Sequence, residues 1–244
     1  MNDRHGILDS IANAFVPINR DGYKFVAGAA IATLFLFLIS DALGWLGAVV
    51  TVFMAYFFRD PDRITPSRAG LVVSAADGKI AAVESVVPSR ELALGPEILT
   101  RLSVFLSVLD VHIVRAPIGG RIVTDNYVPG AFLNAELDKA SEENERRTLV
   151  IETETGEKVG LVLIAGLIAR RIVTFVDEGA SVARGERIGL IRFGSRVDIY
   201  LPSGSEVLAE KGQTAIGGET VIAEFSRDED TSAARVAARS GLED

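Results

Sequence analysis

Residues 178–189, EGASVARGERIG, contain the pattern that decides the fold class. Gly179, Gly185 and Gly189 separate short runs of aliphatic and polar residues. Glycine tolerates the positive φ of tight turns, and short apolar runs between such turns are typical of strands. The stretch therefore predicts a tight β hairpin followed by a strand.

Short β-branched runs continue on both sides of this stretch at close spacing. They predict a mainly β domain folded as a flattened barrel or sandwich. The glycine-spaced hairpin resembles those of biotinyl and lipoyl carrier domains, and short helices are expected at residues 95–101 and 134–139. The runs interpreted as strands are residues 70–74, 79–83, 121–123, 148–153, 160–165, 171–175, 188–191 and 197–201.

The N-terminal part differs, because two long stretches there carry no charge: Phe25 to Ser40 and Ala42 to Phe58, separated by Asp41. One helix over both would be roughly 50 Å long, which exceeds a hydrocarbon core of about 30 Å. Two helices of roughly 25 Å each would fit with slight thinning of the bilayer. We therefore expect a hydrophobic helical hairpin that anchors the chain in a membrane. The alternative is a helical hairpin buried in a soluble core.

Basic residues flank both outer ends of this segment, Arg20 and Lys24 before it and Arg59 and Arg63 after it. Basic residues favour the cytoplasmic side of a membrane, so both ends are expected there. The charged, proline-containing residues 59–63 mark a boundary. The expected domains are an anchoring segment at residues 1–58, a β-rich domain with the candidate chemistry at 59–225, and a charged, flexible tail at 226–244.

Composition excludes several classes of function. The net charge of −8 over 244 residues argues against nucleic acid as a partner. Because the chain has no cysteine, it has no disulfide, thiolate metal site or cysteine nucleophile. Its two histidines, His5 and His112, occur in unrelated contexts, so no metal site is expected. A cofactor must come from outside or be made from the chain itself.

The Gly194-Ser195 step lies between two strand-like runs. Taken alone, such a step is most often a turn. The freedom of a glycine backbone also lets another group approach its carbonyl closely. The hydroxyl of the following serine could attack that carbonyl if a base removed its proton.

His112 is the only histidine of the β-rich domain. A lone histidine on a strand is more often a satisfied core residue, but imidazole is also the default base near neutral pH. A carboxylate is expected to orient such a base, and Asp77, which precedes Gly78, is the candidate. The alternative for Asp77 is a simple Asp-Gly turn, and spacing alone does not decide between these interpretations.

Seven stretches resemble, in order along the chain, the phosphatidylserine decarboxylase family in its short bacterial and archaeal form. They span about residues 58 to 202, and the ordered set is far more specific than any single stretch. Two positions depart from the pattern: Val114 stands where asparagine is expected, and Leu163 stands where glutamine is expected. Both departures could alter the polarity of the substrate pocket. The matching stretches are residues 58–63, 76–80, 110–117, 129–130 with 132–135, 138–146, 164–171 and 192–198.

The resemblance implies a proenzyme that cleaves itself. Asp77 would orient His112, and His112 would deprotonate Ser195. The hydroxyl would attack the Gly194 carbonyl, and elimination of the resulting ester would separate residues 1–194 from residues 195–244, which would stay associated. Ser195 would thereby become a pyruvoyl group, a cofactor whose carbonyl withdraws electrons as CO2 leaves.

The resemblance also implies phosphatidylserine as substrate, phosphatidylethanolamine and CO2 as products, and the lipid bilayer as a partner. The expected location is the bacterial cell membrane with the catalytic domain on the cytoplasmic side, and a homo-oligomer is left open. Arg115, Arg170 and Arg171 are candidates to bind the headgroup phosphate and carboxylate, because guanidinium forks suit such anions. Their alternative role is a solvated strand end or a contact with the bilayer surface.

Other functions fit the residues less well. A pyruvoyl decarboxylase of a different amine would not need residues 25–58. A membrane-tethered, non-enzymatic β-barrel-like adaptor would need neither the Gly194-Ser195 step nor His112. A serine hydrolase is disfavoured because Phe193 and Val197 stand where a nucleophile elbow has glycines. A carrier domain is disfavoured because residues 178–184 hold no lysine to accept a cofactor.

Overall fold

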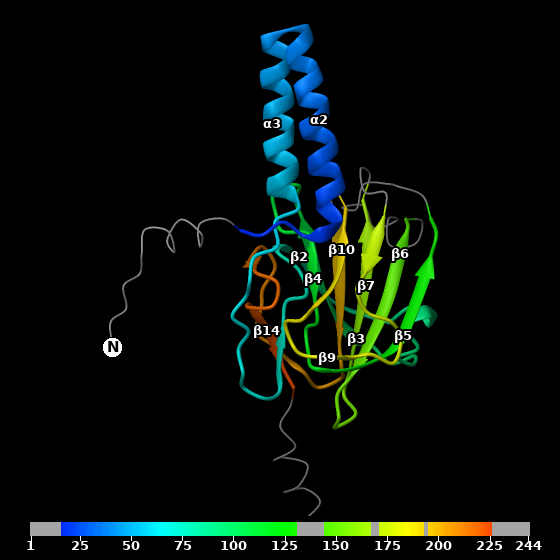
Figure 1. The fold of residues 1–244 in the computed structure, drawn as a ribbon. Coiled ribbons are helices and arrows are strands. Elements are labelled where there is room, and N and C mark those ends of the chain that lie inside the picture. The colour runs from blue at the N-terminus through cyan, green and yellow to red at the C-terminus, as the bar shows by residue number, and fades with distance from the viewer. Residues whose placement is uncertain (1–15, 131–143, 167–170, 193–194, 226–244) are drawn as a thin grey trace, which may run out of the picture.

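The computed structural model describes residues 16–130, 144–166, 171–192 and 195–225. A helical hairpin stands on one end of a β domain, and the base of the hairpin makes the contact between them (Figure 1). The chain is therefore mainly β with an apolar helical part near its N-terminus, which confirms the fold class predicted from the sequence.

The helical hairpin consists of α2 (Tyr23–Ile39) and α3 (Asp41–Phe57), preceded by the 3-10 turn η1 (Arg20–Gly22). Ser40 is extended and separates the two helices next to the single charge at Asp41. The expected pair of apolar helices is confirmed. Residues Arg20–Ile39 are long and apolar enough to cross a membrane, and α3 is shorter. Most of the Arg20–Ile39 stretch is exposed, which argues against a hairpin buried in a soluble core.

Small and hydroxylated residues let α2 and α3 approach each other closely. A Cβ atom at Gly47 would lie 2.8 Å from Thr33 Oγ1. The hydroxyl oxygens of Thr33 and Thr51 are 2.9 Å apart across the helix pair, and each hydroxyl also contacts a carbonyl four residues earlier in its own helix. Such contacts stabilise helix pairs in apolar surroundings, where hydrophobic burial cannot drive association.

Short strands follow the hairpin, most of them where the sequence predicts them. One further 3-10 turn, η2, covers Arg90–Leu92. The strands are β1 (Leu71–Val73), β2 (Gly78–Val86), β3 (Leu99–Leu106), β4 (Ile113–Arg115), β5 (Gly120–Val128), β6 (Arg146–Glu152), β7 (Lys158–Ala165), β8 (Ile172–Thr174), β9 (Ser181–Val182), β10 (Arg187–Ile191), β11 (Ser195–Leu201), β12 (Glu206–Val207), β13 (Thr214–Ala215) and β14 (Val221–Glu224).

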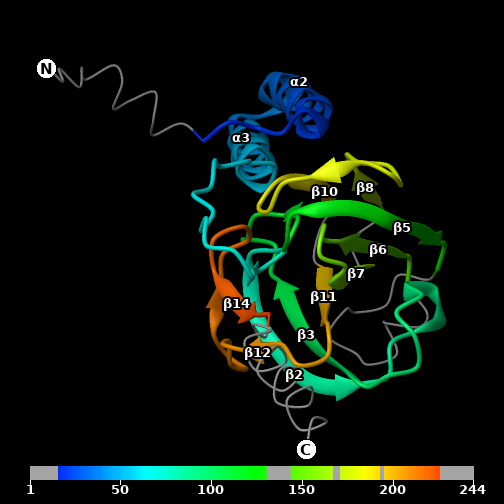
Figure 2. The ribbon, with the colours of Figure 1, turned by 90° about the horizontal axis from the view of Figure 1, so that it is seen from below.

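The described strands form one large sheet and two small ones. The large sheet has the order β13-β2-β3-β11-β7-β6-β5-β9, and its neighbouring strands are antiparallel. It curls into a half-barrel when seen along the hairpin axis (Figure 2). The small sheets have the orders β1-β14-β12 and β4-β10-β8.

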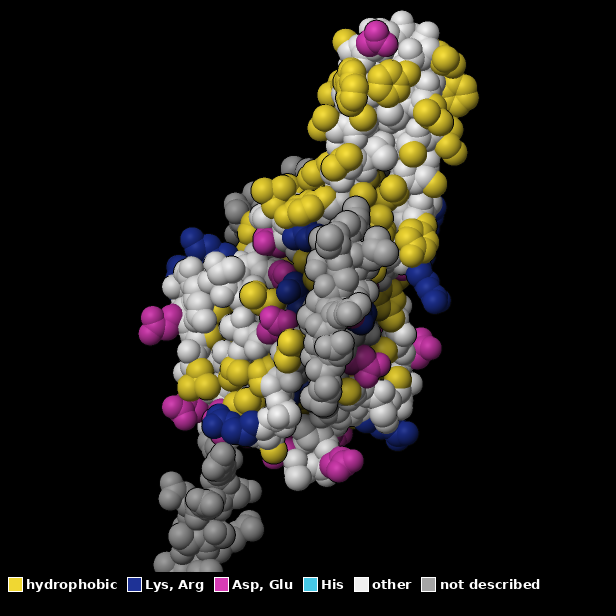
Figure 3. All heavy atoms as spheres, turned by 60° about the vertical axis from the view of Figure 1, so that its left-hand side comes forward, with side chains coloured by type: hydrophobic (Ala, Val, Ile, Leu, Met, Phe, Trp, Pro, Cys, Tyr) yellow, Lys and Arg dark blue, Asp and Glu magenta, His cyan; other side chains and the backbone are white. Residues whose placement is uncertain are grey.

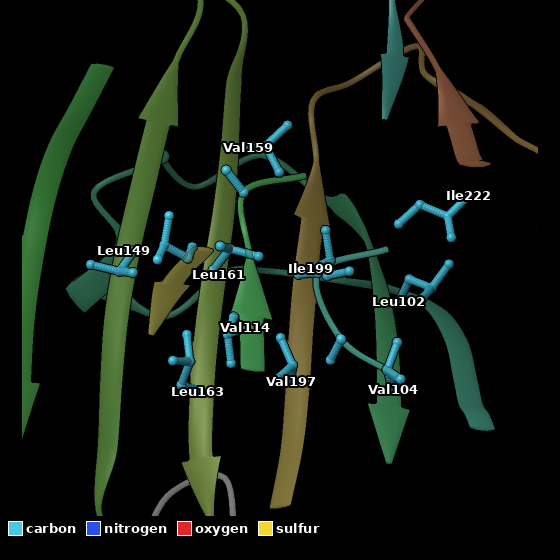
Figure 4. Packing of buried hydrophobic residues seen from close by; sticks show 14 of the residues in the cluster. Leu102, Val104, Val114, Leu149, Val159, Leu161, Leu163, Val197, Ile199 and Ile222 are labelled. Carbon is cyan, nitrogen blue, oxygen red and sulfur yellow. The ribbon is translucent and has the colours of Figure 1, made fainter. Parts of the chain in front are cut away.

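The core lies between the large sheet and the small sheets. Along β11, Val197, Ile199 and Leu201 are all buried in it, as the period of two in a strand requires. Val114 of β4 and Leu163 of β7 belong to the same cluster, and Figure 4 shows them among the aliphatic side chains of the large sheet. The two residues that depart from the family pattern are therefore fully buried apolar core residues.

The hairpin predicted at residues 178–189 is wrong in its pairing. Strand β9 pairs with β5, whereas β10 pairs with β4 and β8, so the two consecutive strands belong to different sheets. Gly185, with φ of +79°, makes the turn between them, and its N–H donates to the Ala116 carbonyl at 2.8 Å. The turn therefore docks on the chain after β4 and does not close a ladder.

The helix predicted at residues 95–101 is also wrong. The chain enters β3 at Leu99, and β3 pairs with β2 on one side and β11 on the other. Strand pairing on both sides outweighs the local propensity that suggested a helix. The second predicted helix, at residues 134–139, and the predicted tail lie outside the described residues.

Candidate active site

Ser195 is the first residue of β11 and lies at the end of the sheet nearest the helical hairpin. It pairs with Leu106, the last residue of β3, and the loop after Leu106 contacts Arg59 at the base of the hairpin. The Ser195 hydroxyl is completely buried and has no hydrogen-bond partner among the residues that the structure describes. A buried hydroxyl without a partner costs about 1–3 kcal/mol, which is typical of a reactive position. Gly194 lies outside the described residues.

His112 immediately precedes β4 and is fully buried. Its Nδ1 lies 2.9 Å from the Asp110 carbonyl oxygen. Because a carbonyl only accepts, Nδ1 carries the proton and the lone pair of the neutral ring is on Nε2. Desolvation by burial lowers the pKa of His112 to about 4. The ring is therefore neutral at pH 7 and its Nε2 can accept a proton.

The backbone brings His112 and Ser195 to the same end of the β domain. The His112 carbonyl accepts from the Ile191 N–H at 3.1 Å. Ile191 is only four residues before Ser195, a span of at most about 14 Å even in an extended chain. A loop of five residues connects His112 to Leu106, the strand partner of Ser195.

Asp77 lies at this same end, directly before β2. One carboxylate oxygen accepts from Arg63 at 2.6 Å and the other from the Gly217 N–H at 2.8 Å. Burial raises the pKa of Asp77, and the charge of Arg63 opposes that rise. The charges of Asp110 and Arg59 act on both Asp77 and His112, so these groups share one electrostatic neighbourhood. That Asp77 orients His112 stays a prediction.

The three candidate substrate arginines occupy different surroundings. Arg115 is buried, and its guanidinium donates to the carbonyls of Gly185 and Pro61, each at 2.8 Å. These contacts tie β4 to the turn between β9 and β10 and to the segment after the helical hairpin, which is a structural role. Arg171 is exposed just before β8, and Arg170 lies outside the described residues. A headgroup contact by any of the three stays a prediction.

Several functional contacts could not be found from the sequence. Arg63 was interpreted only as a flanking charge, yet it pairs with Asp77. Phe57, interpreted as part of the anchor, lies with its ring centroid 4.3 Å from that of His112. The Asp110 carbonyl is a backbone group and leaves no side-chain signature. These contacts arise from strand pairing and from the docking of the hairpin, which local patterns do not encode.

The fold defines a mainly β protein with an apolar helical N-terminal part, and a buried serine hydroxyl and a buried, neutral imidazole lie at the end of the β domain nearest the helices. Comparison with known proteins then identifies the family. Residues 50–223 match the family model described as phosphatidylserine decarboxylase. The chain is 54% identical over 218 residues to the phosphatidylserine decarboxylase proenzyme of Nitrobacter winogradskyi, covering 89% of this chain and 88% of that protein. The chain belongs to the phosphatidylserine decarboxylase family, whose members are pyruvoyl-dependent carboxy-lyases.

Proposed function

We propose that this chain is a self-cleaving proenzyme whose processed form converts phosphatidylserine to phosphatidylethanolamine and CO2 at a membrane. The observation that carries the proposal is the 54% identity to a phosphatidylserine decarboxylase proenzyme over 89% of the chain. The buried hydroxyl of Ser195, which has no hydrogen-bond partner within the described part of the chain, supports it, because a serine that must react with its own backbone has to be kept from water and from competing hydrogen bonds.

Self-cleavage uses residues of the chain itself. The Nε2 atom of His112 takes the proton of the Ser195 hydroxyl, and the oxygen attacks the Gly194 carbonyl. The protonated His112 gives this proton to the Ser195 nitrogen, and the amide bond breaks as the ester forms, so the acyl group moves from nitrogen to oxygen. Elimination then removes the α-proton of Ser195 and releases residues 1–194 as a carboxylate. The remaining dehydroalanine takes up water and loses ammonia.

The surroundings of Ser195 fit the pyruvoyl group that this processing yields. The residue is buried at a strand start, and its side chain shares a face with the apolar Val197. When present, the group supplies a carbonyl that withdraws electrons as CO2 leaves. His112 is the candidate for returning a proton to the product carbon, and the low dielectric of its surroundings strengthens any charge interaction there.

The helical hairpin supports a membrane location. A phospholipid substrate keeps its acyl chains in the bilayer, so the catalytic domain has to be held against the membrane surface. Arg20 and Lys24 lie at the base of the hairpin and Asp41 at its far turn. Because basic residues favour the cytoplasmic face, we propose that the catalytic domain faces the cytoplasm. The two processed chains would stay associated through the large sheet, in which β11 pairs with β3 and β7.

The experiment supplies phosphatidylserine labelled at its headgroup carboxyl carbon in vesicles and follows labelled CO2. Purified wild-type protein should release CO2 and form phosphatidylethanolamine, and the Ser195→Ala variant should do neither. Free serine and other soluble amino acids serve as competing substrates. Release of CO2 from a soluble amino acid alone would favour a different pyruvoyl decarboxylase, and no release from any substrate would favour the adaptor.

A further inference from the structure

The loop between β3 and β4 exposes two adjacent large apolar side chains. Val108 is 38% exposed and Leu109 is 59% exposed. The loop is held in shape from within, since the Asp110 carboxylate accepts from the N–H and the hydroxyl of Ser107 at 2.8 and 2.7 Å. The Asp110 N–H also donates to the Ser107 carbonyl at 3.0 Å. The apolar tip is therefore presented outward by a defined turn.

This loop is fixed to the base of the helical hairpin. Arg59, which follows α3, donates to the Leu109 carbonyl at 2.7 Å and to the Tyr56 carbonyl at 2.9 Å. Val111, at the other end of the loop, packs in one buried cluster with Phe57. Figure 3 shows hydrophobic side chains continuing from the hairpin onto the adjoining end of the β domain. The loop tip and the hairpin thus share the same end of the molecule.

We propose that Val108 and Leu109 form a second lipid-contact site that enters the bilayer surface beside the helical hairpin. The proposal rests on the membrane anchoring inferred above. The committed partner is a lipid bilayer, because the exposed apolar tip adjoins helices with an apolar, largely exposed surface. Adjacent exposed apolar side chains beside such a surface are typical of a membrane contact.

The lipid contact has a consequence for the site. The loop ends at Asp110, whose carbonyl accepts the Nδ1–H of His112, while Phe57 of the hairpin packs against the same ring. His112 is therefore held between two elements that both reach the membrane surface. Insertion of Leu109 into the bilayer fixes the distance between His112 and the headgroup layer. The loop should therefore raise kcat/KM for membrane-bound substrate.

Depth-dependent quenching tests the contact directly. Trp45 is the only tryptophan, so a Trp45→Phe background gives a clean probe. In that background, Leu109→Trp is compared with Ile98→Trp in vesicles of brominated phosphatidylcholine. Ile98 is similarly exposed, at 66%, and precedes the opposite end of β3. Leu109→Trp should be strongly quenched and Ile98→Trp only weakly. Equal, weak quenching in both variants would overturn the proposal.

Quenching of the native Trp45 distinguishes a failure of the loop contact from a failure of membrane anchoring. Trp45 lies near the far turn of the helical hairpin and should be quenched if the hairpin enters the bilayer. Quenched Trp45 with an unquenched Leu109→Trp probe would reject the loop contact and leave the anchor standing. Unquenched wild-type Trp45 would reject the anchor and the loop contact together.

Activity gives a second, independent readout. Because Leu109→Glu replaces an apolar side chain that gains free energy in the bilayer with a charged one, it should lower kcat/KM on phosphatidylserine vesicles by about tenfold or more. Activity on a short-chain phosphatidylserine below its micelle concentration should not change, and Ile98→Glu should match wild type on both substrates. Unchanged vesicle activity in Leu109→Glu, or an equal loss on both substrates, would contradict the proposal.

Discussion

The ring centroid of Phe57, the last residue of α3, lies 4.3 Å from that of His112, with the two planes tilted by 38°. Phe57 is itself fully buried and packs edge-on against Phe58 at 5.1 Å. The last residue of the helical hairpin therefore packs directly against the ring of the candidate base and helps to shield it from water.

The packing of Phe57 on His112 should determine how far the pH can fall before self-cleavage slows. Burial lowers the pKa of His112 to about 4, so the ring stays a neutral base at any higher pH. The processing rate should be flat from about pH 5.5 to 8 and fall below about pH 5. Phe57→Ala admits water to the ring, so the pKa should rise towards the ordinary value of about 6.5 and the acid limb should move upward with it. Gel analysis of freshly synthesised precursor across pH measures both.

Phe35→Ala is the matched control. Phe35 lies exposed on α2, so this substitution also removes a phenyl ring but leaves the surroundings of His112 unchanged. Its acid limb should coincide with that of the wild type. If the processing rate of Phe57→Ala falls at the same pH as that of the wild type, the packing of Phe57 does not control the pKa of His112.

The burial of His112 should also lower the free energy of unfolding of the unprocessed protein in acid. The unfolded His112 binds its proton near pH 6.5 and the folded one only near pH 4. Between these values the unfolded state binds more protons, so stability from this group is complete above pH 6.5 and is lost as the pH falls towards 4. The loss amounts to about 3 kcal/mol. Urea unfolding of Ser195→Ala from pH 7 to 4, with and without His112→Gln, measures it; an equal slope in both proteins would contradict the assignment.

Asp77 should be needed for processing, although Nδ1 of His112 donates to the backbone carbonyl of Asp110. Asp77→Asn keeps the shape of the side chain but removes the charge that pairs with Arg63. We expect self-cleavage to slow by about tenfold or more. Asp125→Asn is the control, because it breaks a comparable ion pair, with Arg147, in another part of the large sheet. Equal rates in the two variants, followed by mass spectrometry, would remove Asp77 from the site.

Arg115 and Arg171 should separate into structural and substrate roles. Arg115→Lys cannot reach both the Gly185 and Pro61 carbonyls, so the free energy of unfolding should fall by about 1–3 kcal/mol. Arg171→Ala, at an exposed position, should change stability by less than about 0.5 kcal/mol. If Arg171 binds the headgroup, its loss should raise KM and leave kcat unchanged. A stable Arg115→Lys with a raised KM would restore Arg115 as a substrate residue.

The close packing of the helical hairpin should depend on Gly47. A Cβ there would lie 2.8 Å from Thr33 Oγ1, whereas a Cβ at Gly28 meets nothing within 4 Å. Gly47→Val should therefore destabilise the helix pair by about 1–3 kcal/mol, and Gly28→Val should not. Trp45 packs on Phe37 at 5.8 Å, so its fluorescence during thermal unfolding in detergent micelles reports the effect. Equal unfolding curves for both variants would contradict this packing.

The sequence predicted what depends on local pattern. The uncharged runs on either side of Asp41 gave the two helices, and the β-branched runs gave strands such as β6 and β7. What depends on distant contacts was missed. Strand β3 was partly interpreted as a helix, because its place between β2 and β11 is set by pairing with residues 13 to 101 positions away in the chain. The pairing of Arg63 with Asp77 and the packing of Phe57 on His112 have the same origin.

The mass of the purified protein tests the central claim most directly. Wild type and Ser195→Ala are compared side by side after folding in membrane-like conditions. If the chain cleaves itself, the wild type should give two chains, split between Gly194 and Ser195 with a pyruvoyl-blocked terminus on the smaller one, and the variant should give one intact chain. A wild-type protein that stays a single chain of 26.1 kDa would contradict self-cleavage at Ser195.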